Sequence, residues 1–451
     1  MLARLRFTNF KTWAEADLPL GNVTGLFGTN SSGKTSILQF LLMLKQTKQA
    51  TDRAISLELN GPLVQLGTIK DAIHQHDEDK AVEFSIGFEL KSELALQDVR
   101  GSRSTDLVKS KSLEIRSEVI VQQMAPLAKR LTYCLGTAEF SLLPRPGSDG
   151  KFELAAAGVP DFEFVRTLGR PWALPGPVKT YAFPDQARTY FQNASFLSEL
   201  EAAYEAEMDR IFYLGPLRNY PQRDYLWARS RPSDVGLRGE KAIDAILAAT
   251  EANETRNLKP KAHLKSFQEM IAYWLREMGL IHAFKVEEIA PGSNRWQARV
   301  TTRPGGTQVL LTDVGFGVSQ VLPVITLLYY VPEGSTVILE QPEIHLHPLA
   351  QAELADVILN VATHRRVQVI VESHSEHLLL RLQRRIAEEK ASAKDVKLYF
   401  CRAEKERSIA EPLNLDMLGN ILNWPDKFMG DAFTETAQAE LARLKRMKAA
   451  E

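Results

Sequence analysis

An eight-residue glycine-rich motif, Gly28–Thr35, constrains the fold of this chain more than any other feature of its sequence. It reads GTNSSGKT and fits the pattern G-x-x-x-x-G-K-[ST]. The apolar run 23–27 before the motif predicts a strand, and the apolar residues of 36–45 after it predict a helix buried on most sides. A strand, a glycine-rich turn and a helix N-terminus in this order direct backbone N–H groups at phosphate oxygens. The motif therefore predicts a P-loop for a nucleoside triphosphate.

The motif also assigns contacts to individual residues. Lys34 is expected to reach the β- and γ-phosphates, and Thr35 is expected to ligate Mg²⁺. The remaining phosphate contacts are expected from the turn itself, at Asn30, Ser31, Ser32 and Gly33. The predicted ligands are therefore a nucleoside triphosphate and Mg²⁺.

The C-terminal half contains motifs that could complete such a site. A P-loop needs a neighbouring strand that ends in a carboxylate near the metal, and the apolar strand predicted over 336–339 ends at Glu340. The strand predicted over 367–371 leads into a polar cluster that contains His374. Ahead of both, the glycine-rich turn 313–320 opens a helix, and the N-terminus of a helix is suited to an anion. We therefore expect these segments to lie near the nucleotide.

The order of the predicted elements indicates an α/β fold with a long insertion. From residue 317 to 389, helices and apolar strands alternate, which is typical of a parallel sheet. The first stretch, 3–8, alternates and predicts an edge strand. Further alternating strands, which predict an inserted antiparallel sheet, are expected at 82–90, 112–122 and 130–143. Helices are expected at 194–210, 241–252 and 261–280, followed by strands at 284–289, 296–301 and 308–311.

We therefore predict an α/β P-loop head, a mixed sheet flanked by helices, with inserted antiparallel β and helical regions. Four parts are expected along the chain. They are an N-terminal part of the head at 1–80, the inserted region at 81–280, a C-terminal part of the head at 281–392, and a small C-terminal domain at 393–451.

Composition excludes several classes of protein. The net charge is −1, so no global attraction to DNA or anionic lipid is expected, and a nucleic-acid surface would have to be a local patch. Two cysteines are too few for a disulfide framework or a zinc cluster, which suits a reducing cytoplasm. Neither a signal peptide nor an apolar run long enough for a membrane span is apparent. A soluble cytoplasmic protein is expected.

The motifs in this order resemble those of ABC-type ATPases of the SMC, RecF and OLD-nuclease branch. In this resemblance Gly28–Thr35 is Walker A, Glu340 is the Walker B acid, Gly315–Gln320 is the signature motif and His374 is the switch histidine. The opening Asn9-Phe10-Lys11 is similar to the start of such heads, where Lys11 would approach the nucleotide. The likeness extends to a family of predicted bacterial ATPases with an uncharacterised C-terminal domain, through the strings at 213–218, 340–348, 372–379 and 423–425.

The resemblance implies that ATP is the nucleotide and that two heads dimerise head to tail. Each ATP would lie between Walker A of one chain and the signature motif of the other. Gly315, Gly317 and Ser319 would then bind near the γ-phosphate held by the partner. The expected assembly is a homodimer or a higher even-numbered oligomer. Chains of this kind often accompany effector nucleases in bacterial anti-phage defence, so the resemblance also implies a separate nuclease as partner.

Two departures from the family pattern bear on catalysis. The signature usually begins with a serine, and Gly315 takes that position here. Many relatives have a glutamate base directly after the Walker B acid, whereas this chain has Gln341. A carboxamide can orient water but cannot accept its proton. Either Glu343 acts as the base, or hydrolysis is slow and the protein acts as a switch.

Several other residues allow two interpretations each. Arg218 and Arg223 could clamp phosphate or pair with acids such as Glu240. Gln65 is a candidate for a Q-loop residue near Mg²⁺. His345 and His347 lack partners with zinc-ligand spacing and are expected to shape the loop after Walker B. The basic runs, which could bind DNA but are more often solvated helix faces, lie at 365–366, 381–385 and 443–448.

The sequence thus predicts an ABC-type ATPase that closes as a dimer around Mg-ATP and switches a partner. Two alternatives stay open. The first is a DNA-repair ATPase that clamps DNA directly. The second is a nucleotide-gated scaffold that does not hydrolyse ATP, for which Gln341 is the supporting feature. No nuclease constellation is visible, and the segment 396–451 is too short for a complete metal-dependent nuclease domain.

Overall fold

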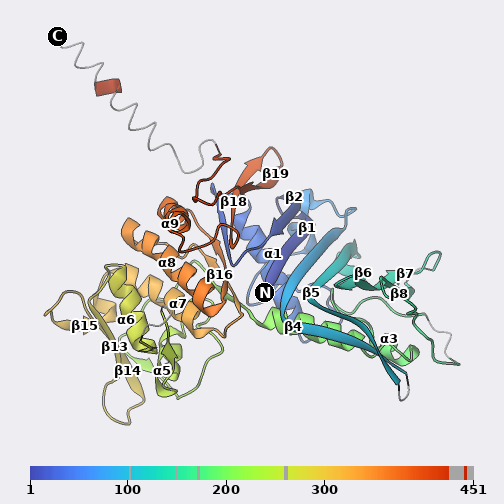
Figure 1. Cartoon of the computed structure of the whole chain (residues 1–451), viewed down its shortest axis with the longest axis horizontal. Helices are drawn as coiled ribbons and strands as arrows, with labels where there is room; N and C mark the ends of the chain where they lie inside the picture. The colour runs from blue at the N-terminus through green and yellow to red at the C-terminus, as the bar shows by residue number, and fades with distance from the viewer. Residues whose placement is uncertain (101–102, 149, 170–172, 259–262, 426–440, 444–451) are drawn as a thin grey trace.

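The computed structural model describes residues 1–100, 103–148, 150–169, 173–258, 263–425 and 441–443. Two large sheets organise the chain, and helices pack between and around them (Figure 1). One sheet has six strands in the order β19-β18-β3-β17-β16-β9, and the other has seven in the order β2-β1-β4-β5-β6-β7-β8. The predicted combination of a mixed sheet, flanking helices and antiparallel strands is confirmed.

The six-stranded sheet holds the P-loop strand. Its strands are β3 (Val23–Gly28), β9 (Ile211–Leu214), β16 (Thr336–Glu340), β17 (Gln368–Glu372), β18 (Val396–Glu404) and β19 (Arg407–Leu413). All pairings except that of β18 with β19 are parallel. The central strands are apolar and buried on both faces, as parallel sheets require. Because carboxyl ends of parallel strands share one edge, Gly28, Leu214, Glu340 and Glu372 end along the same edge.

Helices lie next to the strands of this sheet in the chain order. They include α1 (Lys34–Gln49), α7 (Phe316–Tyr330), α8 (Pro348–Arg365) and α9 (Glu376–Ala387). Of these, α1, α8 and α9 each follow a strand, and α7 precedes β16. The ends of α8 and α9 follow from local chemistry. Pro348 occupies the first position of α8, where its missing N–H costs nothing, and Ser375 caps α9 by accepting a hydrogen bond from the N–H of Leu378 at 3.0 Å.

The seven-stranded sheet combines N-terminal and inserted strands. Its members are β1 (Leu2–Phe10), β2 (Trp13–Pro19), β4 (Val82–Arg100), β5 (Arg103–Gln122), β6 (Ala125–Leu135), β7 (Ala138–Pro144) and β8 (Phe152–Ala157). The prediction that the first strand is an edge strand is wrong, because β1 pairs with β2 on one side and β4 on the other. The predicted strand over 130–143 is two strands, since the chain turns at Gly136 with φ of 59°.

The remaining elements are shorter. A small sheet contains β10 (Tyr225–Leu226), β13 (Ala283–Glu288), β14 (Arg295–Thr301) and β15 (Gln308–Leu310), and a second ladder contains β11 (Thr255–Arg256) and β12 (Lys265–Ser266). The other helices are α2 (Ile69–Ala72), α3 (Asp185–Tyr190), α4 (Leu197–Asp209), α5 (Ala242–Glu251), α6 (Phe267–Glu277) and the 3₁₀ turns His74–His76 and Leu311–Asp313. The helices predicted over 194–210 and 241–252 and the strands predicted over 284–311 are confirmed within a few residues. The helix predicted over 261–280 begins only at Phe267, and residues 261–262 lie outside the described residues.

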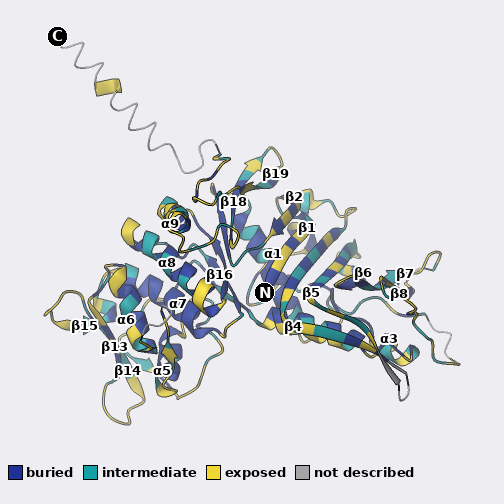
Figure 2. Cartoon of the chain, in the orientation of Figure 1, coloured by how far each residue is buried: buried dark blue, intermediate teal, exposed yellow. Residues whose placement is uncertain are grey.

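Two hydrophobic cores cover the two faces of the six-stranded sheet. Helix α1 and the antiparallel sheet share one core with Leu26, Ile338 and Ile370. Helices α5 to α9 share the other core with Val23, Phe27 and further strand residues. Figure 2 shows that the sheet and its helices are buried along their facing sides. The sheet is therefore clamped between two cores, which fixes the edge that carries the P-loop.

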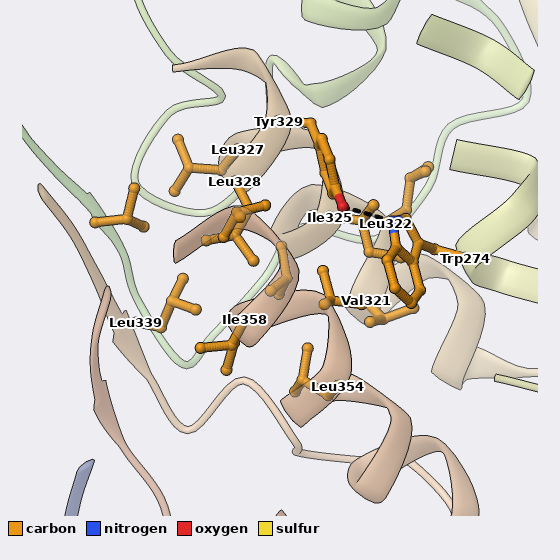
Figure 3. Packing of buried hydrophobic residues seen from close by; sticks show 14 of the residues in the cluster. Trp274, Val321, Leu322, Ile325, Leu327, Leu328, Tyr329, Leu339, Leu354 and Ile358 are labelled. Carbon is orange, nitrogen blue, oxygen red and sulfur yellow. Dashed lines mark hydrogen bonds between the residues drawn. The ribbon is translucent and has the colours of Figure 1, made fainter. Parts of the chain in front are cut away.

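The second core contains a buried polar relay among its apolar side chains. Figure 3 shows Tyr329 and Trp274 meeting across α7 and α6. The indole N–H of Trp274 donates to the Tyr329 hydroxyl at 2.8 Å, and that hydroxyl donates to Asn360 Oδ1 at 2.6 Å. Each buried polar atom of this relay thus has a partner. The apolar residues of the helix predicted over 261–280 pack inside this core from Phe267 onward, whereas Leu264 is exposed.

Within the described residues, no helix is both long and apolar enough to cross a membrane. The division of the chain into four domains stays a prediction. In the last predicted domain, residues 426–440 and 444–451 lie outside the described residues, and these include residues 444–448 of the basic run.

Candidate nucleotide and metal site

The P-loop joins β3 to α1 and closes around the side chain of Lys34. The ammonium Nζ donates to the carbonyl oxygens of Gly28 at 3.1 Å and Thr29 at 2.7 Å, and to Ser32 Oγ at 3.4 Å. Burial lowers the pKa of Lys34, and the charge of Glu372 opposes that shift. A cation held inside a loop of backbone groups at a helix N-terminus is suited to a phosphate chain.

Gly33 allows the loop to pack tightly. Its φ is 87°, a left-handed conformation, and it caps α1. A Cβ at this position would lie 2.6 Å from Ser408 Oγ, 2.7 Å from Thr12 Oγ1 and 2.8 Å from Trp13 Nε1. The Trp13 indole N–H also donates to the Gly33 carbonyl at 3.0 Å. The glycine is therefore required by both the backbone conformation and the space.

Thr35 contacts an acid that the sequence did not assign to the site. Its hydroxyl lies 2.9 Å from both carboxylate oxygens of Glu372. Glu372 ends β17, which lies between the P-loop strand β3 and the Glu340 strand β16. The sequence pattern that could have identified Glu372 is an acid at the end of an apolar strand. Only the strand order, however, shows that β17 is the direct neighbour of β3. That order cannot be read from the sequence.

Glu340 and Glu372 stand side by side at the end of the sheet. They are partners in the register of β16 and β17. Burial, together with the charge of Glu340, raises the pKa of Glu372 to about 7. Burial also raises the pKa of Glu340, whose Oε2 accepts a hydrogen bond from the Tyr213 hydroxyl at 2.7 Å. A buried acid whose pKa is raised further by the charge of a neighbouring acid is an arrangement that a bound cation relieves.

These residues fit Mg²⁺. The ion prefers hard oxygen ligands and is usually held by one or two carboxylates, waters and substrate phosphates. The Thr35 hydroxyl, Glu372 and Glu340 supply such oxygens at the mouth of the P-loop. No group of three or more His, Cys, Asp or Glu side chains with metal-site geometry occurs in the described residues. A magnesium ion here would therefore depend on the phosphates for part of its shell.

The structure brings His374 and Glu343 together beside this site. Glu343 Oε1 accepts the backbone N–H of His374 at 2.7 Å, and Glu343 is only 6% exposed. Burial raises the pKa of Glu343. Burial and the charge of Lys34 lower the pKa of His374. A hydrogen bond to the backbone of Gly28 acts in the opposite direction and raises the pKa, but its effect is smaller. His374 is therefore held neutral and close to the P-loop.

Gln341 takes an unusual backbone conformation. Its φ is 44°, and its N–H donates to the carbonyl of Glu372 at 2.8 Å. This bond extends the pairing of β16 with β17 by one residue and turns the chain toward Glu343. The left-handed turn thus places the two candidate water-orienting groups, Gln341 and Glu343, on the same short segment.

The two arginines after β9 differ in their surroundings. Arg218 is 6% exposed, and its Nη2 donates to the Glu340 carbonyl at 3.4 Å. Burial lowers its pKa to about 10, and Glu343 is the first of the charges that oppose this shift. Arg223 is exposed and pairs with Asp313 at 3.1 Å. Glu240 instead accepts from the backbone N–H of Arg238, so the pairing suggested for Glu240 is wrong.

The predicted signature residues lie at the start of α7, which belongs to the core on the sheet face opposite α1. Gly315 caps α7, and a Cβ there would meet no atom within 4 Å. A Cβ at Gly317 would lie 3.2 Å from the carbonyl oxygen of His345, so this glycine is more closely surrounded. Ser319 is buried and donates to the Phe316 carbonyl at 2.8 Å, so its hydroxyl is engaged within the helix.

Lys11 and Gln65 occupy different surroundings. Lys11 Nζ donates to Gln39 of α1 at 2.7 Å, and burial lowers the pKa of Lys11. Gln65 is exposed, and the N–H of the preceding Val64 donates to Gln46 at 3.0 Å. Gln46 lies near the C-terminus of α1, which places it roughly 16 Å along the helix from Thr35. The structure therefore does not bring Gln65 to the metal site.

The two histidines after β16, His345 and His347, have contacts within the local structure. His347 Nδ1 accepts from the N–H of Leu349 at 3.5 Å and caps α8. The ring of His345 meets Phe316 edge to face, with centroids 4.9 Å apart. Phe316 in turn packs against the exposed Tyr220 at 5.3 Å. The loop after β16 is thus attached to the N-terminus of α7.

Family models match three segments of the chain. A family model described as "AAA ATPase domain" matches residues 1–136, and one described as "AAA domain, putative AbiEii toxin, Type IV TA system" matches residues 187–381. Residues 392–438 match "Protein of unknown function (DUF3696)". No curated protein matches the chain.

Solved structures similar to the chain include heads of SMC proteins. The SmcHead bound to the C-winged helix domain of ScpA is 13% identical, with a TM-score of 0.45, and covers 92% of this chain and 98% of that chain. The SMC head domain from Thermotoga maritima is 11% identical, with a TM-score of 0.40, and the match covers 92% of this chain and 99% of that domain. A third structure is the Smc head domain with an extended coiled coil, bound to the C-terminal domain of ScpA derived from Pyrococcus furiosus. It is 11% identical, with a TM-score of 0.42, and the match covers 98% of this chain and 99% of that chain.

The two ATPase matches meet in one sheet. The first contains the P-loop and β3, and the second contains Glu340, His374 and the strands β16 and β17. Strand β3 pairs directly with β17, so the two matched segments build the same site. The two segments that match ATPase family models, on either side of residues 137–186, therefore both contribute strands to one six-stranded sheet.

Proposed function

We propose that the chain is an ABC-type ATPase that binds Mg-ATP, hydrolyses it and closes as a dimer around it. The observation that carries the proposal is the contact of the Thr35 hydroxyl with Glu372 beside Glu340, next to a P-loop that already encloses Lys34. A hydroxyl, two carboxylates and a lysine at a helix N-terminus are the groups that a Mg-nucleotide requires.

Each residue has a role in this proposal. Lys34 and the P-loop N–H groups hold the β- and γ-phosphates. Thr35 and the two carboxylates hold Mg²⁺, which neutralises charge on the phosphates when bound. His374, neutral because of burial and Lys34, can donate one hydrogen bond to the γ-phosphate region.

Glu343 is the group that we assign as the base. Its Oε1 is fixed by the His374 N–H, whereas Oε2 is buried and has no partner within the described part of the chain. Burial that raises the pKa of a carboxyl makes its ionised form a stronger proton acceptor. Oε2 is therefore the oxygen that would accept the proton of the attacking water. Gln341 would orient the same water without accepting its proton.

Thr35 provides a direct test of the metal role. Thr35→Val keeps the shape of the side chain and removes the hydroxyl, so we expect the Mg²⁺-dependent part of ATP affinity to fall about tenfold or more, as for loss of a ligand to a charged group. Thr35→Ser keeps the hydroxyl and serves as the matched control. Titration of a fluorescent ATP analogue with and without Mg²⁺ measures the effect. Equal Mg²⁺ dependence in Thr35→Val and the unmodified chain would contradict the assignment.

The proposed dimer places the N-terminus of α7 against the ATP of the partner. Support comes from Gly315 and Gly317 at that helix end, on the face opposite the chain's own α1. A helix N-terminus with small residues attracts phosphate and allows close approach. The partner that reads the closed state is proposed to be a separate nuclease in anti-phage defence, in the cytoplasm. The match to a domain described with a toxin–antitoxin system supports a defence role.

Gly315 offers a substitution that separates dimerisation from folding. Its φ is −55° and its surroundings are open, so Gly315→Asp should fold, and aspartate is a favourable helix cap. The added charge would repel the phosphates of the partner. We expect Gly315→Asp to lose ATP-dependent dimers in light scattering while its melting temperature holds or rises, and Gly315→Ala to keep them. ATP-dependent dimers of normal abundance in Gly315→Asp would count against this interface.

An alternative function, direct clamping of DNA, is favoured by no contact of the described residues. Arg381 and Arg385 pair with Glu353 and Asp356, so these cations of the second basic run are already neutralised. The comparison that separates the two functions is ATP turnover with and without duplex DNA.

A further inference from the structure

Arg218 is a buried cation without enough partners. It follows β9 at the edge of the sheet where Glu340 and Glu372 end. Its side chain is 6% exposed, yet Nε and Nη1 have no hydrogen-bond partner among the described residues. Its remaining bond, from Nη2 to the Glu340 carbonyl, is long at 3.4 Å. A guanidinium has five N–H donors, so most of its capacity is unused.

The neighbouring carboxylates do not supply the missing acceptors. Glu340 accepts from Tyr213 and Glu343 accepts from the His374 N–H, and neither lies within ion-pair distance of Arg218. Burial lowers the pKa of Arg218 to about 10 in spite of these two charges. Buried polar groups are nearly always paired in folded proteins. An unpaired buried arginine at a ligand site therefore indicates an acceptor that arrives with the ligand.

Strand order gives the position of that acceptor. Lys34 belongs to the β3 side of the sheet edge, and Arg218 follows β9, with β17 and β16 between them. At about 4.8 Å between strands, β3 and β9 are separated by roughly 14 Å. Phosphates that start in the P-loop and extend along this edge would pass Glu372 and Glu340 toward Arg218. The terminal phosphate would come closest to Arg218, and planar guanidinium donors match phosphate oxygens in pairs.

We propose that Arg218 binds the terminal phosphate of ATP held in its own chain and thereby makes the site selective for a triphosphate over a diphosphate. This inference rests on the proposed ATP-binding function. Arg218 and Lys34 grip the phosphate chain from opposite sides of the two carboxylates. Glu343, whose Oε2 has no hydrogen-bond partner among the described residues, is the first of the charges that act on Arg218, so nucleotide binding would supply Arg218 with its acceptor near the proposed base.

The test is the affinity of the full chain for a non-hydrolysable ATP analogue and for ADP, both with Mg²⁺, by calorimetry. In Arg218→Gln we expect affinity for the analogue to fall about tenfold or more, and affinity for ADP to change by less than about twofold. Arg218→Lys keeps the charge without the planar fork and should give a smaller loss of the same selectivity. Arg295→Gln, which removes an exposed arginine paired with Asp224, is the control and should change neither value.

Each outcome has a meaning for the proposal. An unchanged ratio of the two affinities in Arg218→Gln and Arg218→Lys would overturn it, whether both affinities hold or both fall together. A lower melting temperature without nucleotide, with an unchanged ratio, would show that Arg218 only supports the fold. If the unmodified chain binds neither nucleotide, the ATPase proposal itself fails, and that result is distinct from a failure of Arg218 alone.

Discussion

Lys34→Ala should reduce ATP affinity by about a hundredfold or more. The Lys34 ammonium is enclosed by the P-loop, 2.7 Å from the Thr29 carbonyl and 3.1 Å from the Gly28 carbonyl. Phosphate oxygens in the loop would replace these neutral acceptors with charged ones. Two hydrogen bonds between charged groups, at about 1.5–3 kcal/mol each, amount to about 3 to 6 kcal/mol, which corresponds to a hundredfold to ten-thousandfold change.

The control for Lys34→Ala lies on the same helix. Lys48→Ala removes a lysine at the other end of α1, where it pairs with Asp209 on the surface at 2.7 Å. We expect Lys48→Ala to bind ATP as the unmodified chain does. Calorimetry or a fluorescent analogue measures both variants, and thermal unfolding shows that each is folded. Normal ATP affinity in folded Lys34→Ala would mean that the nucleotide does not lie in the P-loop.

Glu343→Gln should abolish phosphate release and leave ATP binding nearly intact. Glutamine has the size of glutamate and retains an oxygen for the His374 N–H, which Glu343 accepts at 2.7 Å. It cannot accept a proton from water, so turnover should fall by about a hundredfold to ten-thousandfold, the usual contribution of general base catalysis. ATP-dependent dimers should accumulate because the nucleotide is bound but not cleaved.

Two further variants identify the group that acts on the water. Glu251→Gln changes an exposed acid paired with Arg229 and should leave turnover unchanged. Gln341→Ala removes the other candidate. Full turnover in Glu343→Gln combined with loss in Gln341→Ala would assign the water to Gln341, and the role proposed for Glu343 would be wrong.

The sequence predicted the parts of the site whose chemistry is local. The P-loop, its strand and its helix are contiguous, and their spacing alone defines a phosphate turn. Glu340 follows an apolar run, so it could be recognised as an acid at the end of a strand. The parallel strands β16 and β17 were predicted for the same reason, because continuous apolar runs between helices are typical of a buried parallel sheet.

Other parts depend on strand order and burial, which sequence patterns do not contain. Glu372 becomes a site residue only because β17 lies between β3 and β16. Arg218 and Arg223 were equivalent in the sequence, and burial of one and exposure of the other distinguish them. Strand β1 was expected at an edge because its alternation fits any strand with one exposed face, whereas its two neighbours come from distant segments.

The central claim is that this site hydrolyses Mg-ATP, and steady-state release of phosphate from Mg-ATP tests it most directly. The unmodified chain, Lys34→Ala and Glu343→Gln are compared with and without duplex DNA. We predict turnover by the unmodified chain alone, with loss in both variants and no stimulation by DNA. Phosphate release that persists in Lys34→Ala, or its absence from the unmodified chain while ATP is bound, would contradict the account.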